Sequence, residues 1–129
     1  MRGTTEIEIG GKLRTVKFGT NQSAKYCEIR GLTLEESRSQ FRNLFIFSKD
    51  GKELIGSNET GGEIRDLIFS GLWAGAITGS EKVDFNQYTV GEWIDEMDQS
   101  VLNQIFSTLI NSNDGGDIEG GGSDKPEKK

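Results

Sequence analysis

The longest apolar stretch of the chain spans residues 67–77, and glycine recurs in and just after it at every fourth position. With Ile64 its aliphatic residues repeat at the spacing of one helix face, so the sequence predicts a helix over residues 64–77. The stretch is too short for the roughly 20 residues that cross a bilayer. Each glycine within a helix costs about 1 kcal/mol relative to alanine. The three glycines, Gly71, Gly75 and Gly79, therefore indicate close packing within the domain, against another helix backbone.

The start of the chain has the pattern of a β-hairpin. Ile7 and Ile9 alternate with glutamates, a Gly-Gly pair follows, and Val16 and Phe18 belong to a second apolar run. Two glycines between such runs are typical of a two-residue turn. A lone hairpin is marginally stable, so we expect the hairpin over residues 5–18 to pack on helices.

A first helix is predicted over residues 21–30. Ala24, Cys27 and Ile29 are expected to face inward, and Gly31 supplies the left-handed residue that ends the helix. Cys27 is then a small buried hydrophobe.

A capping box formed by Thr33 and Glu36 predicts a second helix over residues 34–47. Residues 43–55 also fit a hairpin, because an Asp-Gly pair separates two apolar runs there. We favour the helix and keep the hairpin as the alternative. A loop follows over residues 56–62.

A second capping box, Thr89 to Glu92, predicts a short helix bearing Trp93. Asp98 is expected to cap a final helix, which carries the strongest apolar stripe in the chain and ends at residues 111–113.

The fold class expected from these elements is α+β and mainly helical, with the hairpin packed on a small bundle of about four to five helices. Residues 1–112 form one domain. Residues 113–129 are rich in glycine and acidic side chains and have Ile118 as their one large apolar residue. Because such a segment cannot bury enough surface to offset its ordering entropy, we expect a flexible tail.

The chemistry of the side chains favours a protein that is not an enzyme. The chain has no histidine and one cysteine, which excludes Ser/His/Asp and Cys/His catalysis and a Cys-rich zinc site. Residues 111–119 resemble the start of a calcium loop, but glycine stands at its fifth and twelfth positions, Gly115 and Gly122. The carboxylates of residues 92–98 suit the wet face of a helix. We expect no catalytic, metal or cofactor site.

The charge balance also limits the partners. The formal net charge is −6 and the isoelectric point is about 4.7, which disfavours nucleic acid. The first residues lack the apolar run of a signal peptide, so we expect a soluble intracellular protein without membrane contact. Residues 1–49 carry +4 and residues 50–112 carry −8. This split favours attraction within one fold, with self-association as the alternative.

The second half of the chain has more aromatic residues than a small domain strictly needs, and aromatic side chains are common anchors of protein interfaces. For most of them a place in the core is the simpler interpretation. The candidate partner-binding residues are Trp73, Phe85, Tyr88 and Trp93.

Three segments resemble the tail assembly chaperones of long-tailed, siphovirus-like bacteriophages and prophages. They are the hairpin over residues 8–19, the aliphatic helix with its Gly-Leu pair over residues 66–75, and the run over residues 88–97 followed by a Leu/Ile/Phe helix. The resemblance covers about residues 5–112, and residues 42–62 are longer and richer in glycine than the family pattern.

The resemblance implies a non-enzymatic chaperone that binds the tape-measure protein and helps to recruit tail-tube subunits. Such a protein acts in the host bacterial cytoplasm and is absent from the mature virion. The alternatives are a structural tail or head-tail connector subunit, and a small protein-binding regulator.

Overall fold

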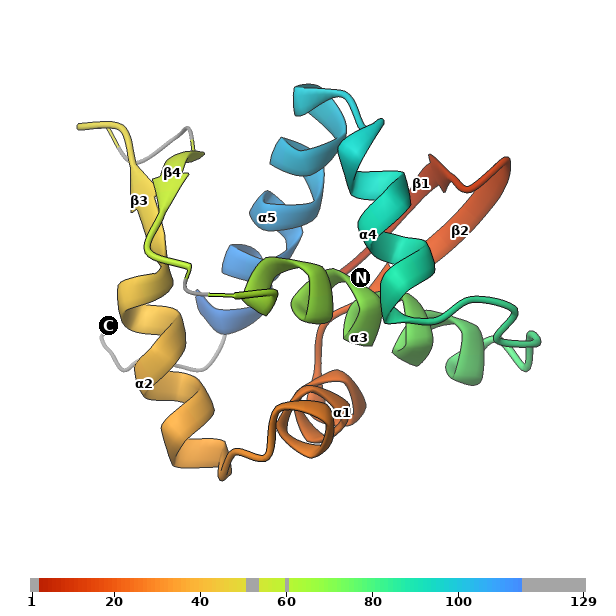
Figure 1. Ribbon diagram of the computed structural model, residues 1–129, viewed down its shortest axis with the longest axis horizontal. Helices are drawn as coiled ribbons and strands as arrows, with labels where there is room; N and C mark the ends of the chain where they lie inside the picture. The colour runs from red at the N-terminus through yellow and green to blue at the C-terminus, as the bar shows by residue number, and fades with distance from the viewer. Residues whose placement is uncertain (1–2, 51–53, 60, 115–129) are drawn as a thin grey trace.

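The computed structural model describes residues 3–50, 54–59 and 61–114. In chain order, its elements are β1 (Thr4–Ile9), β2 (Lys12–Lys17), α1 (Thr20–Arg30), α2 (Leu34–Leu44), β3 (Phe45–Phe47), β4 (Leu54–Ser57), α3 (Glu63–Thr78), α4 (Gln87–Asp95) and α5 (Gln99–Asp114). The fold is α+β and mainly helical, with the N-terminal hairpin packed on the helices, which confirms the predicted fold class. Figure 1 shows α3 through the middle of the molecule, α1 on one side of it, and α4 and α5 on the other.

Helix α3 contains the predicted helix over residues 64–77 and forms the centre of the core. Eleven of its 16 residues are buried, and a helix buried on nearly every side needs neighbours on nearly every side. Strand β2 and helices α1 and α4 supply them. The side chains of Leu67, Ile68 and Leu72 are almost completely shielded from solvent.

The N-terminal hairpin has the predicted two-residue turn. Ile9 pairs with Lys12 across a two-residue turn, and both turn glycines have positive φ, +64° at Gly10 and +85° at Gly11. A turn of this kind matches the twist of the two strands. One face of the hairpin is buried and supplies Ile7, Ile9 and Val16 to the core.

Gly71 and Gly75 of α3 do make close contacts, but these contacts are with the N-terminal hairpin and its end and not with another helix. A β-carbon at Gly71 would lie 2.9 Å from side-chain atoms of Val16 and Phe18, and one at Gly75 would overlap the carbonyl of Thr15. Strand β2 therefore lies directly on α3. Gly79 is the C-cap residue and lies outside this contact.

The inward face of α1 differs from the prediction. Its buried residues are Gln22 and Tyr26, whereas Ala24 is exposed and Cys27 is half-buried. Both buried side chains have polar partners: Gln22 Nε2 donates to Ser70 Oγ at 2.9 Å, and the Tyr26 hydroxyl donates to Gln40 Oε1 at 2.6 Å. A polar group with a partner can be buried at little net cost. A prediction that considered only apolar residues therefore chose the wrong buried face of α1. Ile29 is half-buried against the core.

The preferred helix over residues 34–47 is wrong beyond Leu44, and the hairpin alternative is right. The capping box of Thr33 and Glu36 is present, but the backbone becomes extended at Phe45 and β3 pairs antiparallel with β4. Asn58 explains this ending, because its backbone N–H donates to the Leu44 carbonyl and its side chain to the Asn43 carbonyl, each at 2.7 Å. These bonds satisfy carbonyls that a longer helix would have used.

One other predicted boundary is shifted. The loop predicted over residues 56–62 begins later, because β4 continues to Ser57. Gly51 of the predicted Asp-Gly turn lies outside the described residues.

The second capping box belongs to a different pair of residues. Asn86 is the N-cap of α4 and Thr89 is its N3 partner, so the helix begins three residues earlier than predicted. Helix α5 begins directly after Asp98, as predicted, and runs to Asp114. The tail was predicted over residues 113–129, but residues 113 and 114 belong to α5. The rest of the predicted tail, and most of the calcium-like loop, lie outside the described residues.

Candidate protein-interaction site

The four candidate aromatic anchors lie in different environments. Phe85 is buried and packs edge-on against Phe69, with 5.8 Å between ring centroids. Trp73 is half-buried beside α1, where the Lys25 ammonium lies 4.9 Å from the ring centroid. Tyr88 is 73% exposed. Of the four, Tyr88 is the side chain that presents most of its surface to a partner.

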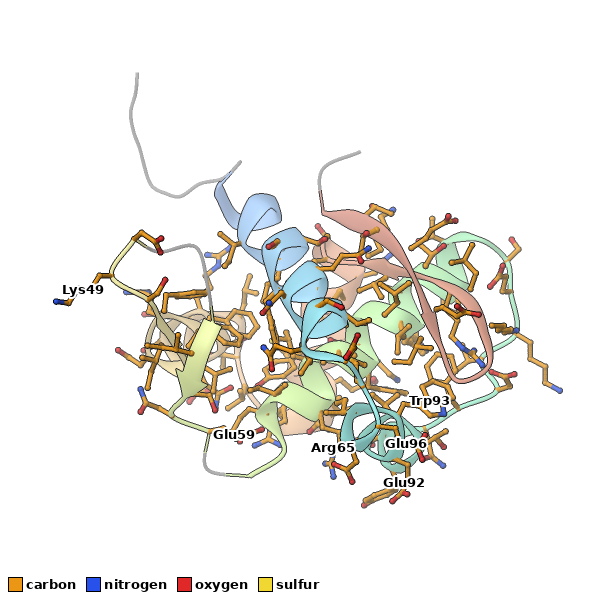
Figure 2. The ribbon with its side chains drawn as sticks, turned by 90° about the horizontal axis from the view of Figure 1, so that it is seen from above. Lys49, Glu59, Arg65, Glu92, Trp93 and Glu96 are labelled. Carbon is orange, nitrogen blue, oxygen red and sulfur yellow. The ribbon has the colours of Figure 1, made fainter. Side chains whose placement is uncertain are left out.

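Trp93 connects α4 to the N-terminal hairpin. Its ring lies against Gly10, where an added β-carbon would be 2.7 Å from the indole Cη2 atom. The Arg14 guanidinium lies 4.7 Å from the Trp93 ring centroid and pairs with the Asp84 carboxylate at 3.0 Å. Figure 2 shows Trp93 directed toward the hairpin and Glu92 directed away from it. Trp93 therefore fixes the inward side of α4 against the N-terminal hairpin.

The outward face of α4 carries a regular row of side chains. Tyr88, Glu92 and Asp95 stand at positions i, i+4 and i+7, which share one side of a helix. All three are exposed. Because Trp93 fixes the opposite side of the helix, this row points away from the core.

A buried carboxylate joins α3, α1 and α4 beneath this row. The Asp66 side chain is 2% exposed, and it accepts hydrogen bonds from Arg30 Nη1 at 2.8 Å, Arg65 Nε at 2.9 Å and Gln87 Nε2 at 3.1 Å. Burial by itself would raise the pKa of Asp66, but the bonds from Arg65, Arg30 and Gln87 outweigh it and keep the pKa below its ordinary value. Asp66 is therefore ionised at neutral pH.

The contact with Asp66 positions Arg65 beside the exposed tyrosine. The Arg65 guanidinium lies 5.3 Å from the centroid of the Tyr88 ring, a distance at which a cation is attracted to an aromatic face. The Tyr88 ring thus has Arg65 as a packing partner, although most of the side chain is open to solvent.

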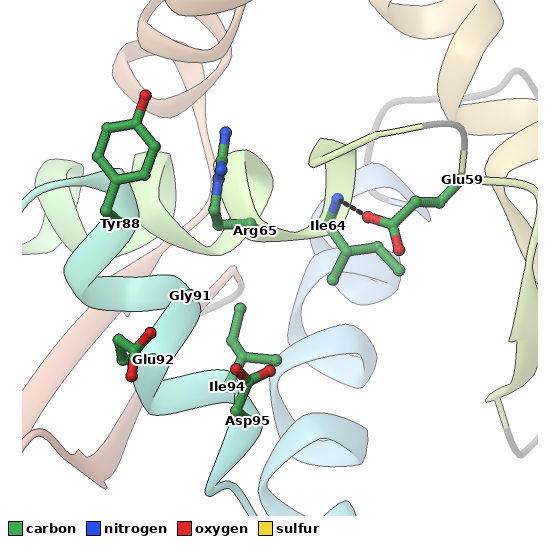
Figure 3. Close-up of a pocket in the computed structure, with 8 residues that line it drawn as sticks. All are labelled: Glu59, Ile64, Arg65, Tyr88, Gly91, Glu92, Ile94 and Asp95. Carbon is green, nitrogen blue, oxygen red and sulfur yellow. Dashed lines mark hydrogen bonds between the residues drawn. The ribbon is translucent and has the colours of Figure 1, made fainter.

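An open cleft of about 390 Å³ lies between the start of α3 and the outward face of α4. We call it the α3–α4 cleft. Figure 3 shows the residues that line it, which are Glu59, Ile64, Arg65, Tyr88, Gly91, Glu92, Ile94 and Asp95. Two isoleucines supply apolar surface, and Glu59 accepts a hydrogen bond from the Ile64 backbone N–H at 3.0 Å.

This arrangement is suited to binding a polypeptide. It combines apolar surface with an exposed tyrosine, which are features of a surface that receives another helix. The carboxylates of Glu92 and Asp95 lie beside them. The carboxylates that the sequence suggested for the wet face of α4, Glu92, Asp95, Glu96 and Asp98, are all exposed. Across the described ranges, no three potential metal ligands cluster together.

Sequence reasoning identified Tyr88 but missed the other half of the cleft. Glu59, Ile64 and Arg65 come from the segment before α3 and from its first turn. The repeat of Tyr88, Glu92 and Asp95 was a usable signal for the α4 side. No local pattern indicates which residues of another element lie opposite that row.

Comparisons of the chain with protein-family models, curated proteins and solved structures find no match. Within the part of the chain that the structure describes, no helix combines the length and the apolarity needed to span a membrane.

Proposed function

We propose that this protein is a non-enzymatic assembly chaperone of a long-tailed bacteriophage. It binds the tape-measure protein through the α3–α4 cleft and helps to recruit tail-tube subunits in the host cytoplasm. It leaves before the virion is complete. The observation that carries the binding role is Tyr88, which is 73% exposed at an open cleft although the neighbouring Phe85 is buried.

Two kinds of observation support the proposal. The order of sequence segments resembles that of the tail assembly chaperones, which supplies the biological context. The cleft supplies a surface for a helical partner, because large aromatic side chains with a rigid support are frequent centres of binding energy. A cover for a long helical protein requires this kind of surface and no catalytic group.

Co-expression with the tape-measure protein of the same phage tests the proposal. We expect the tape-measure protein to remain in solution with this chain and to precipitate without it, and light scattering should find several copies bound to each partner. Tyr88→Ala should release the partner. Leu34→Ala is the matched control, since Leu34 is also exposed but lies on α2.

Purified phage particles provide the opposing test. A chaperone is absent from them, whereas a tail or connector subunit remains in them. If the chain is found in particles at the copy number of a ring and does not bind the tape-measure protein, the chaperone proposal is wrong.

A further inference from the structure

We infer that the α3–α4 cleft receives the basic face of an amphipathic helix, with lysine or arginine side chains against Glu92 and Asp95. This inference rests on the proposed function, because it names the chemistry of the partner segment. Four observations support it: the charge of the cleft, the unfavourable position of that charge on α4, its apolar lining and its spacing.

The cleft has excess negative charge. Three carboxylates line it, from Glu59, Glu92 and Asp95, against the single cation of Arg65. The Arg65 guanidinium is already paired with Asp66. Glu92 and Asp95 form no ion pair with any other residue that the structure describes. A basic partner would therefore meet carboxylates that this fold does not neutralise.

The acidic side chains also stand at the unfavourable end of α4. Glu92 and Asp95 lie in its last turn, Glu96 is the C-cap residue, and no basic side chain lies in that turn. The C-terminal end of a helix carries partial negative charge and favours cations, and the acidic pair at positions 92 and 96 is repulsive at this spacing. The free domain folds despite this repulsion among negative charges at the end of α4. Cations of a partner would reduce the repulsion.

The remaining lining selects a helix over a lone cation. Ile64 and Ile94 are half-buried and present apolar surface beside the carboxylates. Tyr88, Glu92 and Asp95 extend over about 10 Å along the α4 axis, given a rise of about 1.5 Å per residue. A helix lying along α4 presents side chains at the same i, i+4 and i+7 spacing, so it can alternate apolar and basic contacts.

The test uses a labelled synthetic peptide with leucine and lysine at helical spacing, and a matched peptide in which glutamate replaces lysine. Fluorescence anisotropy measures binding of each to the whole chain at low and high salt. We expect the basic peptide to bind, to bind more weakly at high salt, and to bind about tenfold more weakly to Glu92→Lys/Asp95→Lys. The acidic peptide should not bind.

A variant with the same change of charge elsewhere is the control. Glu6→Lys/Glu8→Lys alters two exposed carboxylates of the N-terminal hairpin and should bind the basic peptide as the unaltered chain does. Thermal unfolding separates lost binding from lost folding. The cleft variant should unfold at the same or a slightly higher temperature, because it removes repulsion at the end of α4.

Two results of the peptide experiment overturn the inference. The first is equal binding of the basic peptide by the cleft variant and the unaltered chain. The second is a cleft occupied by a second copy of the chain, seen as concentration-dependent association that the cleft variant abolishes while peptide binding is absent. If the cleft variant still retains the tape-measure protein in solution, this inference fails and the proposed function stands. If the peptide binds as expected but the tape-measure protein is not retained, the proposed function fails and the cleft assignment stands.

Discussion

The indole ring of Trp93 lies so close to Gly10 that the structure has no room for a β-carbon at that turn position. This contact joins the N-terminal hairpin to α4, two elements far apart in the sequence. Position 10 favours glycine for two reasons: the indole leaves no space for a side chain, and the backbone has a positive φ that other residues rarely adopt. The orientation of α4, and with it the direction of its outward face, therefore depends on a turn near the start of the chain.

Gly10→Ala should lower the free energy of unfolding by about 3 kcal/mol in urea titration. A left-handed backbone costs an alanine about 1–2 kcal/mol, and overlap with the indole adds about as much. Gly11→Ala is the control, because Gly11 also has positive φ but a β-carbon there meets nothing within 4 Å. It should cost only the backbone contribution. In a Trp93→Ala background the two substitutions should cost the same, and an unchanged difference would show that Trp93 is not the obstacle.

Gly75→Ala should be destabilising by about 2 kcal/mol or more, despite a gain of about 1 kcal/mol in helix propensity. The new methyl group would overlap the Thr15 carbonyl, so β2 would have to move away from α3. Gly79→Ala, at the next position of the same glycine series, should change stability by less than about 0.5 kcal/mol. Similar losses at both positions in urea titration would contradict the close strand contact.

Asp66→Asn should lower the free energy of unfolding by about 2–4 kcal/mol at neutral pH. The substitution leaves Arg30 and Arg65 without their carboxylate, and the loss is moderated because both guanidinium groups remain partly in contact with water. The exposed Asp95→Asn is the control and should change little.

The same pair of variants tests the pH dependence. The pKa of Asp66 is below its ordinary value of 3.8 in the folded chain, so the unfolded chain takes up this proton first as the pH falls. The stability that Asp66 contributes is therefore present above pH 3.8 and is lost as the pH falls from there through the lowered pKa. Asp66→Asn should lose less stability over that interval than the unaltered chain. An identical acid profile for both would show that another carboxylate is responsible.

The unaltered chain should become less stable at alkaline pH because Tyr26 ionises, and Tyr26→Phe should not show this decline. Burial raises the pKa of Tyr26 to about 12 from an ordinary value of 10.0. The unfolded chain then releases the proton first, so stability that is present below pH 10 declines by about 2–3 kcal/mol as the pH rises to 12. Urea titrations across that interval measure the decline. Tyr88→Phe is the control and should keep it, and a decline that survives in Tyr26→Phe would contradict the assignment.

Local patterns were sufficient where a short segment decides its own structure. The Gly-Gly turn, the capping box at Thr33 and the apolar repeat of α3 were all predictable, because neighbours in sequence determine turns, caps and helix faces. The prediction failed at Phe45 because Asn58, a residue beyond the next strand, completes the end of α2. It failed for α1 because the partners of Gln22 and Tyr26 lie on other helices.

The candidate site divides in the same way. Tyr88, Glu92 and Asp95 form a row that helix periodicity reveals. The opposite side of the cleft depends on how α3 packs against α4, and that packing follows from the Asp66 cluster and from Trp93. Those contacts join residues from distant parts of the chain, so no local sequence motif predicts them.

Hydroxyl-radical footprinting of Tyr88 is the most direct test that the α3–α4 cleft binds the partner. The chain has two tyrosines, and the buried Tyr26 serves as the internal reference for Tyr88. In the free chain Tyr88 should be oxidised readily and Tyr26 hardly at all. In the complex with the tape-measure protein, Tyr88 should lose most of its reactivity while Tyr26 stays unchanged. A complex in which Tyr88 is oxidised as fast as in the free chain would contradict the account.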